Sequence, residues 1–299
     1  MTPRSDFSAR NFAGPNTLNP YFDDCRLPPA DRTLPAQARM TVGGVVRDGG
    51  SKDGGAAAYQ YFLSTQASPN HPLQDAISVS TLPGPTMLMT CGDATTHAQG
   101  IAPEDAMHFV FRDQPKSALD QMEAAGWVCP AGLLCAAQQG LRAALDRLPG
   151  AVVGVAQSIV TLDVRTGCIQ LASVGDTQAL IFRPARWWRR ARVRALTTLP
   201  VPGADTRRLA SALGQSAKRA LLMDLASAQL GRGDLLILGT DGGLPAPDAP
   251  ELRLTLQAYE RERRAGLPDL ARLAGVLMQR AERMGNYADD QSLVLLIRL

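Results

Sequence analysis

Residues 233–243 read GDLLILGTDGG, and this stretch does most to define the fold class. The unbroken aliphatic run at residues 235–238 predicts a β-strand that is buried on both faces. Asp241 follows this run closely, and Gly242 stands beside it. A glycine next to a carboxylate lets the backbone approach a bound ion, because it has no Cβ. The stretch therefore predicts a core strand that delivers an acidic side chain to the edge of a sheet.

Three further aspartates occupy similar places in the sequence. Asp93 and Asp176 each follow a short apolar run, and Asp289 precedes the last apolar run, at residues 292–299. Hard divalent cations prefer oxygen ligands, so carboxylates gathered at one edge of a fold predict a magnesium or manganese site. For any one of these positions the alternative is a turn, since aspartate is a common turn residue.

The order of the predicted elements favours an α+β fold with antiparallel sheets. Three early strand-like segments, at residues 59–67, 76–81 and 86–91, precede a helical region at residues 116–147. Two hairpins, a polar helix-prone stretch ending near residue 227, the strand at 235–238, an amphipathic helix at 268–284 and a last strand at 292–299 follow. Sequential hairpins with helices grouped between them differ from the regular alternation of a parallel βαβ sheet. The sequence therefore predicts an antiparallel sandwich.

A Gly-rich segment at residues 48–55 divides the chain into two parts. Such a segment is typical of a flexible linker. We expect an N-terminal extension, partly flexible, at residues 1–55 and one domain at residues 56–299. A run at residues 38–42 is a candidate strand within the extension.

Composition excludes several classes of protein. Apolar residues make up 45% of the chain, which is enough for a large core, and the net charge of +3 does not by itself indicate a polyanion partner. The sequence shows neither an apolar run of membrane-spanning length nor a secretion signal, so we expect no membrane association and a cytoplasmic location. The five cysteines are irregularly spaced and predict buried thiols in place of a disulfide framework or zinc site.

Short motifs in a fixed order carry a resemblance to a known family. They are Gln74-Asp75-Ala76, Asp93-Ala94, Gly175-Asp176-Thr177, Thr240-Asp241-Gly242 and Asp289-Asp290-Gln291-Ser292. This series resembles the motifs of the metal-dependent protein phosphatases of the 2C type, across roughly residues 56–299. The resemblance implies an αββα sandwich, in which two antiparallel sheets are flanked by helices. It also implies a serine/threonine protein phosphatase that hydrolyses phosphoprotein monoesters.

The resemblance further implies a site for two Mg²⁺ or Mn²⁺ ions, with a weaker third ion. Its ligands would be Asp75, Asp93, Ala94 through its carbonyl, Asp176, Asp241 and Asp289. Asp93 would bridge the two main ions, and Asp176 would help to hold the third. A water activated by the metal pair would then attack the phosphorus of the substrate.

The sequence departs from the family pattern in two places. The arginine that the family uses to grip the phosphate is replaced by Asn70, with His71 next to it. The loop after Asp93 reads Ala94-Thr95-Thr96-His97 and lacks the usual glycines. Asn70 and His71 are candidate phosphate contacts, and His97 is a candidate general acid. The alternative for both histidines is a solvated or capping role.

Two other functions remain open. The missing arginine suggests a catalytically weakened pseudophosphatase that serves as a regulatory binding protein.

Residues 183–194 contain six arginines and two tryptophans, which could bind nucleic acid by charge and stacking. We favour a solvated hairpin that contacts an acidic or phosphorylated protein. The expected partners are therefore phosphorylated proteins, including targets of a serine/threonine kinase.

Overall fold

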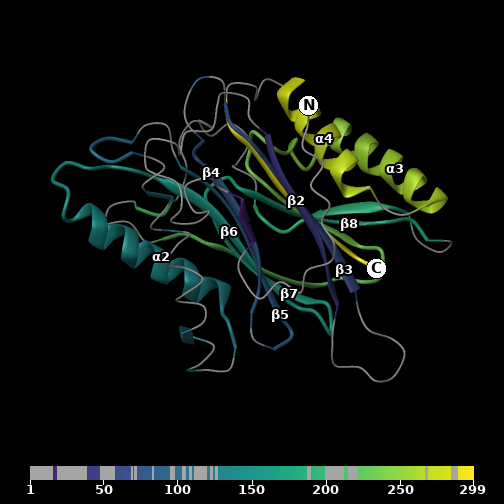
Figure 1. The fold of residues 1–299 in the computed structure, drawn as a ribbon, viewed down its shortest axis with the longest axis horizontal. Coiled ribbons are helices and arrows are strands. Elements are labelled where there is room, and N and C mark those ends of the chain that lie inside the picture. Colours follow the sequence, from purple (N-terminus) through teal and green to yellow (C-terminus); the bar gives the residue numbers. More distant parts are fainter. Residues whose placement is uncertain are drawn as a thin grey trace.

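The computed structural model describes most of the chain. The described residues are 16–18, 39–47, 58–68, 70, 73–82, 84–94, 98–102, 106–107, 110, 120–121, 124, 127–186, 190–198, 212–214, 221–266, 269–283 and 289–299. Within them the strands form two six-stranded sheets, and all neighbouring strands run antiparallel (Figure 1).

The strands of the two sheets come from interleaved parts of the sequence. The first sheet has the order β1 (Asn16–Leu18), β4 (Asp75–Thr81), β5 (Thr86–Ala94), β6 (Val155–Asp163), β7 (Cys168–Val174) and β10 (Asp224–Gln229). The second has the order β2 (Arg39–Arg47), β3 (Ala58–Gln66), β12 (Gln291–Arg298), β11 (Leu235–Gly239), β8 (Gln178–Arg183) and β9 (Arg192–Ala195).

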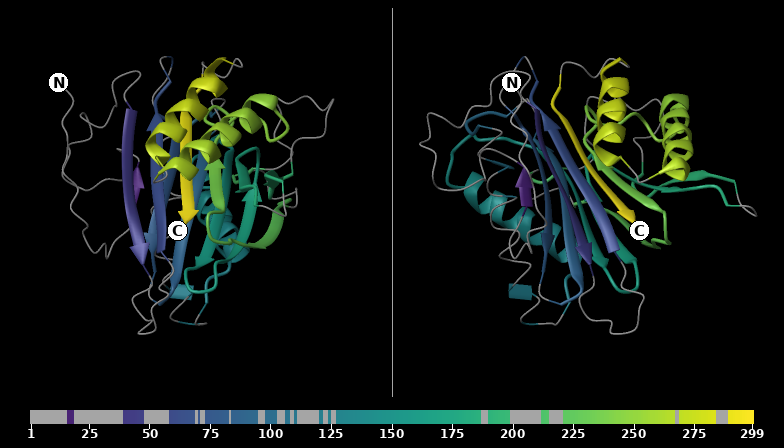
Figure 2. Two further views of the ribbon diagram at one scale, coloured as in Figure 1. Left: turned by 90° about the vertical axis from the view of Figure 1, so that its right-hand side faces the viewer. Right: turned by 45° about the vertical axis from the view of Figure 1, so that its right-hand side comes forward.

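Helices cover the outer face of each sheet, which makes the molecule a four-layered αββα sandwich (Figure 2). Helix α2 (Pro130–Leu145) packs on the first sheet, where Leu134 and Leu141 join a core cluster with Ile159. Helices α3 (Pro250–Ala265) and α4 (Leu270–Ala281) pack on the second sheet. The α+β sandwich predicted from the sequence is thus confirmed.

Strand β11 explains why its sequence is apolar without interruption. Leu236 and Leu238 point into the layer between the sheets, whereas Leu235 and Ile237 point outward beneath α3 and α4. Successive side chains of a strand alternate between faces, so a central strand covered on both faces needs apolar residues at every position. This burial fixes the register of β11 and thereby the place where its following turn begins.

Other sequence predictions meet mixed outcomes. The hairpins β6–β7 and β8–β9 and the helix α4 are confirmed. The helix predicted up to residue 227 is wrong at its end, since residues 224–229 form β10 along the edge of the first sheet. Helix α3 was not predicted.

The segment assigned to an N-terminal extension contributes strands to both sheets. β1 pairs with β4, and β2 pairs with β3 along its full length. These two stretches therefore belong to the sandwich.

The four described cysteines are free thiols, but only Cys91 is buried as expected, while Cys135 and Cys168 are exposed. None of the described helices combines the length and the apolar character needed to cross a bilayer.

Candidate metal centre

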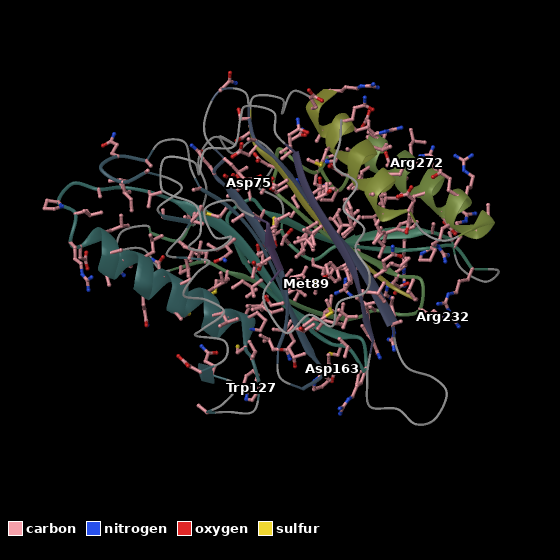
Figure 3. All side chains as sticks on the ribbon, viewed as in Figure 1. Asp75, Met89, Trp127, Asp163, Arg232 and Arg272 are labelled. Atoms are coloured by element: carbon pink, nitrogen blue, oxygen red, sulfur yellow. The ribbon has the colours of Figure 1, made fainter. Side chains whose placement is uncertain are left out.

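Asp75 and Asp93 face each other at one end of the first sheet. They form a directly opposed pair in the β4–β5 ladder. Along β5, Met89 and Cys91 belong to the core between the sheets, and Asp93 continues the same alternation. Both carboxylates are therefore directed to the layer between the sheets, at the end where the apolar core stops. Figure 3 shows Asp75 at this end.

Asp241 and Asp289 come to the same end from the second sheet. The turn after β11 lies against the chain entering β12, where Thr240 N–H donates to the Ser292 carbonyl at 3.1 Å. The contact is so close that a Cβ on Gly242 would collide with the carbonyl oxygen of Asp290. Glycine at this position therefore allows the two turns to touch, and this places Asp241 next to Asp289.

Asp176 lies where the chain crosses from one sheet to the other. It follows β7 of the first sheet and precedes β8 of the second. Gly175 has a φ of 86°, a left-handed conformation that glycine adopts without strain. The crossing occurs at the end of the sandwich that carries the other aspartates.

These carboxylates lie close enough for their charges to act on one another. Burial raises the pKa of Asp93 well above its usual value, and the charges of Asp75, Asp241, Asp289 and Asp176 raise it further. Five acidic side chains, from both sheets and the crossing between them, therefore act on a common region. Such a concentration of negative charge favours a bound cation, which would relieve the repulsion.

Three more of these aspartates have raised pKa values. Burial and the Asp241 charge raise the pKa of Asp176 to about 7. Burial, followed by the charges of Asp290 and Asp289, raises the pKa of Asp75. Burial and the Asp289 charge do the same for Asp241. The cluster therefore retains protons at pH values where an exposed aspartate is fully ionised.

A buried hydroxyl joins the two halves of the site. Oγ1 of Thr240 donates to Oδ2 of Asp75 at 2.9 Å, which links the end of β11 to the start of β4. The same oxygen accepts the backbone N–H of Ser292 at 3.1 Å. Ser292 in turn shares a hydrogen bond of 2.6 Å with Thr65 of β3. These contacts orient Asp75 toward the centre of the acidic cluster.

Asp290 is a site residue to which sequence reasoning gave no role. Its Oδ1 accepts the backbone N–H of Ser68 at 2.6 Å, and its Oδ2 accepts those of Gln74 and Asp75. This side chain therefore holds both ends of the segment between β3 and β4, which contains Asn70. The only sequence signal was its place beside Asp289 in a pair of acids.

The donor set suits a hard divalent cation, because it consists of carboxylate oxygens. Among the described residues, however, no three acidic, histidine or cysteine side chains are already arranged around one ion position. Side-chain movement would be needed to reach the metal–oxygen distances of about 2.0–2.1 Å that Mg²⁺ requires. The residues fit the predicted metal, with Asp75, Asp93, Asp176, Asp241 and Asp289 as the carboxylates that would hold it.

The remaining predicted site residues have different positions. Ala94 ends β5, with its side chain in the core beneath α2, and its N–H donates to the Gln74 carbonyl at 3.3 Å. Asn70 is exposed, and its N–H donates to Oγ of Ser68 at 3.0 Å. His71 and His97 lie outside the described residues. The roles predicted for these four residues stay predictions.

Comparisons with known proteins were made by sequence and by structure. No protein-family model and no curated protein matches the sequence. Among solved structures, the serine/threonine phosphatase Stp1 from Staphylococcus aureus has 15% identity and a TM-score of 0.59, with coverage of 89% of this chain and 98% of that chain. The serine-threonine phosphatase 2C from Toxoplasma gondii has 12% identity and a TM-score of 0.59, with coverage of 89% and 100%.

RsbX, solved in complex with magnesium, has 12% identity and a TM-score of 0.51, and the match covers 85% of this chain and 100% of RsbX. At these identities the likeness concerns the arrangement of the backbone. It agrees with the two antiparallel sheets and the flanking helices described above. The chain therefore has the fold of the protein phosphatase 2C type.

Proposed function

We propose that this protein is a metal-dependent serine/threonine protein phosphatase that hydrolyses phosphoprotein monoesters. The observation that carries the proposal is the convergence of five aspartates, from both sheets and the crossing between them, on one end of a 2C-type sandwich. Burial first, and then the neighbours' charges, raise the pKa values of Asp75, Asp93, Asp176 and Asp241. Asp93, Asp241 and Asp289 would be the principal ligands of two Mg²⁺ or Mn²⁺ ions. Asp75 and the Ala94 carbonyl would serve the second ion, and Asp176 a third.

The ions, when bound, would activate a water and offset the charge of the phosphoryl oxygens. The chain's own residues position the site. Thr240 fixes the orientation of Asp75, and Asp290 holds the backbone on either side of Asn70. Asn70 and His71 would meet the phosphate from that segment. The substrates would be phosphorylated proteins in the cytoplasm, including targets of a serine/threonine kinase.

The test is hydrolysis of a phosphoserine or phosphothreonine peptide with Mn²⁺, with Mg²⁺ and with a chelator. We expect metal-dependent release of phosphate that the chelator abolishes. Asp241→Asn should lower the rate at least about 100-fold, because it removes a charged ligand. Asp248→Asn alters an exposed aspartate outside the cluster and should retain the activity. Equal activity of the Asp241 variant and the native protein would refute the proposal.

A pseudophosphatase is the second candidate, and the exposed Asn70 in the place of the family's arginine favours it. This candidate predicts that Mn²⁺ binds, as measured by calorimetry, while no phosphopeptide is hydrolysed. An Asn70→Arg variant separates the two hypotheses further. A weakened but active phosphatase should show a lower KM in this variant, whereas a pure binding protein should remain inactive.

A further inference from the structure

The far end of the second sheet carries an arginine-lined pocket of about 590 Å³. It lies where β11 begins and β12 ends. Its described lining consists of Arg186, Arg232, Gly233, Arg263, Gly266, Ile297, Arg298 and Leu299. This described lining contains four arginines and no acidic side chain. We call it the arginine pocket. In Figure 3, Arg232 lies well away from Asp75.

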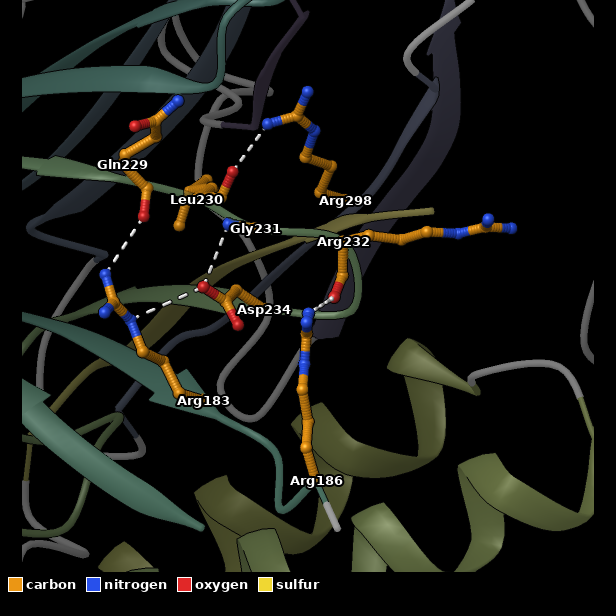
Figure 4. Close-up of polar contacts among 8 residues, drawn as sticks. All are labelled: Arg183, Arg186, Gln229, Leu230, Gly231, Arg232, Asp234 and Arg298. Carbon is orange, nitrogen blue, oxygen red and sulfur yellow. Dashed lines mark hydrogen bonds and ion pairs between the residues drawn. The ribbon is translucent and has the colours of Figure 1, made fainter. Parts of the chain in front are cut away.

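Backbone carbonyls hold two of these arginines in place. Arg186 Nη2 donates to the Arg232 carbonyl at 3.0 Å, and Arg298 Nη1 donates to the Leu230 carbonyl at 2.6 Å (Figure 4). Arg298 also donates to the carbonyls of Thr166 at 3.0 Å and Arg165 at 3.4 Å, so its guanidinium joins the turn before β11 to the turn between β6 and β7. The Arg298 guanidinium also lies 5.8 Å from the ring centre of Tyr59. Carbonyl oxygens fix a guanidinium without cancelling its charge, so these contacts preorganise positive charge.

The acidic residues near the arginine pocket are paired with other arginines. Asp234 Oδ2 lies 3.4 Å from Nε of Arg183 and accepts the Gly231 N–H at 2.9 Å. Glu260 Oε1 lies 2.6 Å from Nη2 of Arg264. Neither Arg183 nor Arg264 lines the pocket. These two acids are therefore largely balanced by other arginines. The lining itself contains four guanidinium groups and the α-carboxylate of Leu299, so the pocket keeps an excess of positive charge.

One lining arginine also has a structural role. Arg263 lies in the last turn of α3, where a positive charge stabilises the helix dipole. Its guanidinium lies over Gly233, which has a φ of 81° and whose missing Cβ would come 3.4 Å from Arg263 Nη1. The helix dipole accounts for Arg263 alone, whereas Arg186, Arg232 and Arg298 come from strands and turns. Backbone carbonyls account for the positions of Arg186 and Arg298, but these contacts do not explain why four arginines line one pocket.

We propose that the arginine pocket binds a small multivalent phosphate anion, such as an oligophosphate or a nucleoside polyphosphate. One guanidinium group can donate two parallel N–H bonds to two oxygens of a phosphate. Four such groups around one pocket match an anion that carries several negative charges. The volume falls in the range of about 300–1,000 Å³ usual for small-molecule sites. The nine residues from Gly233 to Asp241 span roughly 20 Å of strand and turn, so this anion is not the phosphoryl group at the acidic cluster. The proposal does not depend on the proposed function.

The test is calorimetric titration of the full chain with inorganic tripolyphosphate, in 150 mM salt to screen weak surface binding and with a chelator to keep metal out of the acidic cluster. We expect one anion per chain. The double variant Arg232→Ala, Arg263→Ala should weaken binding at least about tenfold. The control double variant Arg147→Ala, Arg253→Ala removes two exposed arginines outside the pocket and should leave the affinity unchanged. Arg232→Ala alone changes an exposed residue and guards against loss of folding.

Several outcomes would overturn the proposal. They are binding of many anions per chain, equal weakening in the control, and unchanged affinity in the pocket variants. Tighter binding of a doubly phosphorylated peptide than of tripolyphosphate would replace the small anion with a protein segment. A parallel titration with ATP distinguishes a nucleoside polyphosphate from a plain oligophosphate as the bound anion. Tighter binding of ATP would identify a nucleotide site, and equal or weaker binding would identify an oligophosphate site.

Discussion

At the scale of single residues, Thr240 connects the two sheets at the acidic cluster. Its hydroxyl donates to Asp75 on the first sheet and accepts from Ser292 on its own sheet. A residue that orients a metal ligand affects metal affinity without touching the ion. Thr240 is thus expected to matter for the geometry of the cluster more than for the stability of the fold.

Thr240→Val keeps the shape of the side chain and removes only the hydroxyl. We expect the affinity for Mn²⁺, measured by calorimetry, to fall by about 10-fold or more, because Asp75 loses its orienting donor. Thr255→Val is the matched control, since the Thr255 hydroxyl donates to the Glu251 carbonyl within α3, at 2.7 Å, away from the cluster. If both variants bind Mn²⁺ as the native protein does, Thr240 has no part in the site.

Residue by residue, the sequence pointed to aspartates that the fold brings to one end of the sandwich, and their roles as metal ligands stay predictions. Asp176 and Asp241 could be picked out from the sequence because each follows an apolar strand. Such strands are apolar because the fold buries them. The sequence alone could not assign different roles to Asp289 and Asp290, because two adjacent aspartates look equivalent in the motif. Only the contact of Asp290 with the β3–β4 segment distinguishes them, and that contact joins residues 222 positions apart.

At the scale of elements, the turn after β11 sets the position of Asp241. This turn lies against the entry to β12 so closely that Gly242 and Gly243 have no room for a Cβ. Gly140, by contrast, lies on an exposed face of α2, where nothing would meet an added methyl group. A glycine-to-alanine substitution should therefore have opposite effects on stability at Gly242 and at Gly140.

Gly242→Ala should destabilise the protein by about 2 kcal/mol or more, because the turn must move away from the Asp290 backbone. Gly140→Ala should stabilise it by about 0.5–1 kcal/mol, since alanine is the better helix former. Denaturant unfolding of both variants measures the difference. A Gly242→Ala protein that is as stable as the native one would show that the turn is not constrained.

The elements that the sequence did not predict have weak local signals. β10 contains Asp224, Ala226 and Ser227, which have low or modest strand propensity, and its pairing with β7 determines its conformation. α3 has a sparse apolar face, with Leu252, Leu256 and Tyr259 buried among charged residues. In both cases a distant partner strand or sheet supplies what the local sequence lacks. β11 and α4 were predicted because their own side chains are apolar at the spacing that burial requires.

At the scale of the whole molecule, the shared charge of the cluster links stability to pH. The folded chain binds protons at Asp75, Asp93, Asp176 and Asp241 more tightly than the unfolded chain, because their pKa values are raised on folding. Stability therefore decreases as the pH rises above the unfolded value of about 4. For Asp176 this loss continues until the pH passes about 7.

We expect the melting temperature of the chelated protein to fall between pH 5.5 and pH 8. Saturating Mn²⁺ should reduce this fall, because the cation replaces the protons in offsetting the carboxylate charge. Asp176→Asn should flatten the pH dependence in the chelated protein, which thermal unfolding at several pH values can measure. A melting temperature that rises across this range in the chelator would contradict the assignment.

The central place of β12 also has a kinetic consequence. β12 lies between β3 and β11, so its inner contacts join positions as distant as Thr65 and Ser292, which are 227 residues apart. Closing such a long loop is entropically costly, and chains with mainly non-local contacts fold slowly. The aspartates from the two sheets meet only after this closure. Metal affinity would therefore mark molecules that have finished folding, and a dye-monitored metal titration during refolding would follow the last step of assembly.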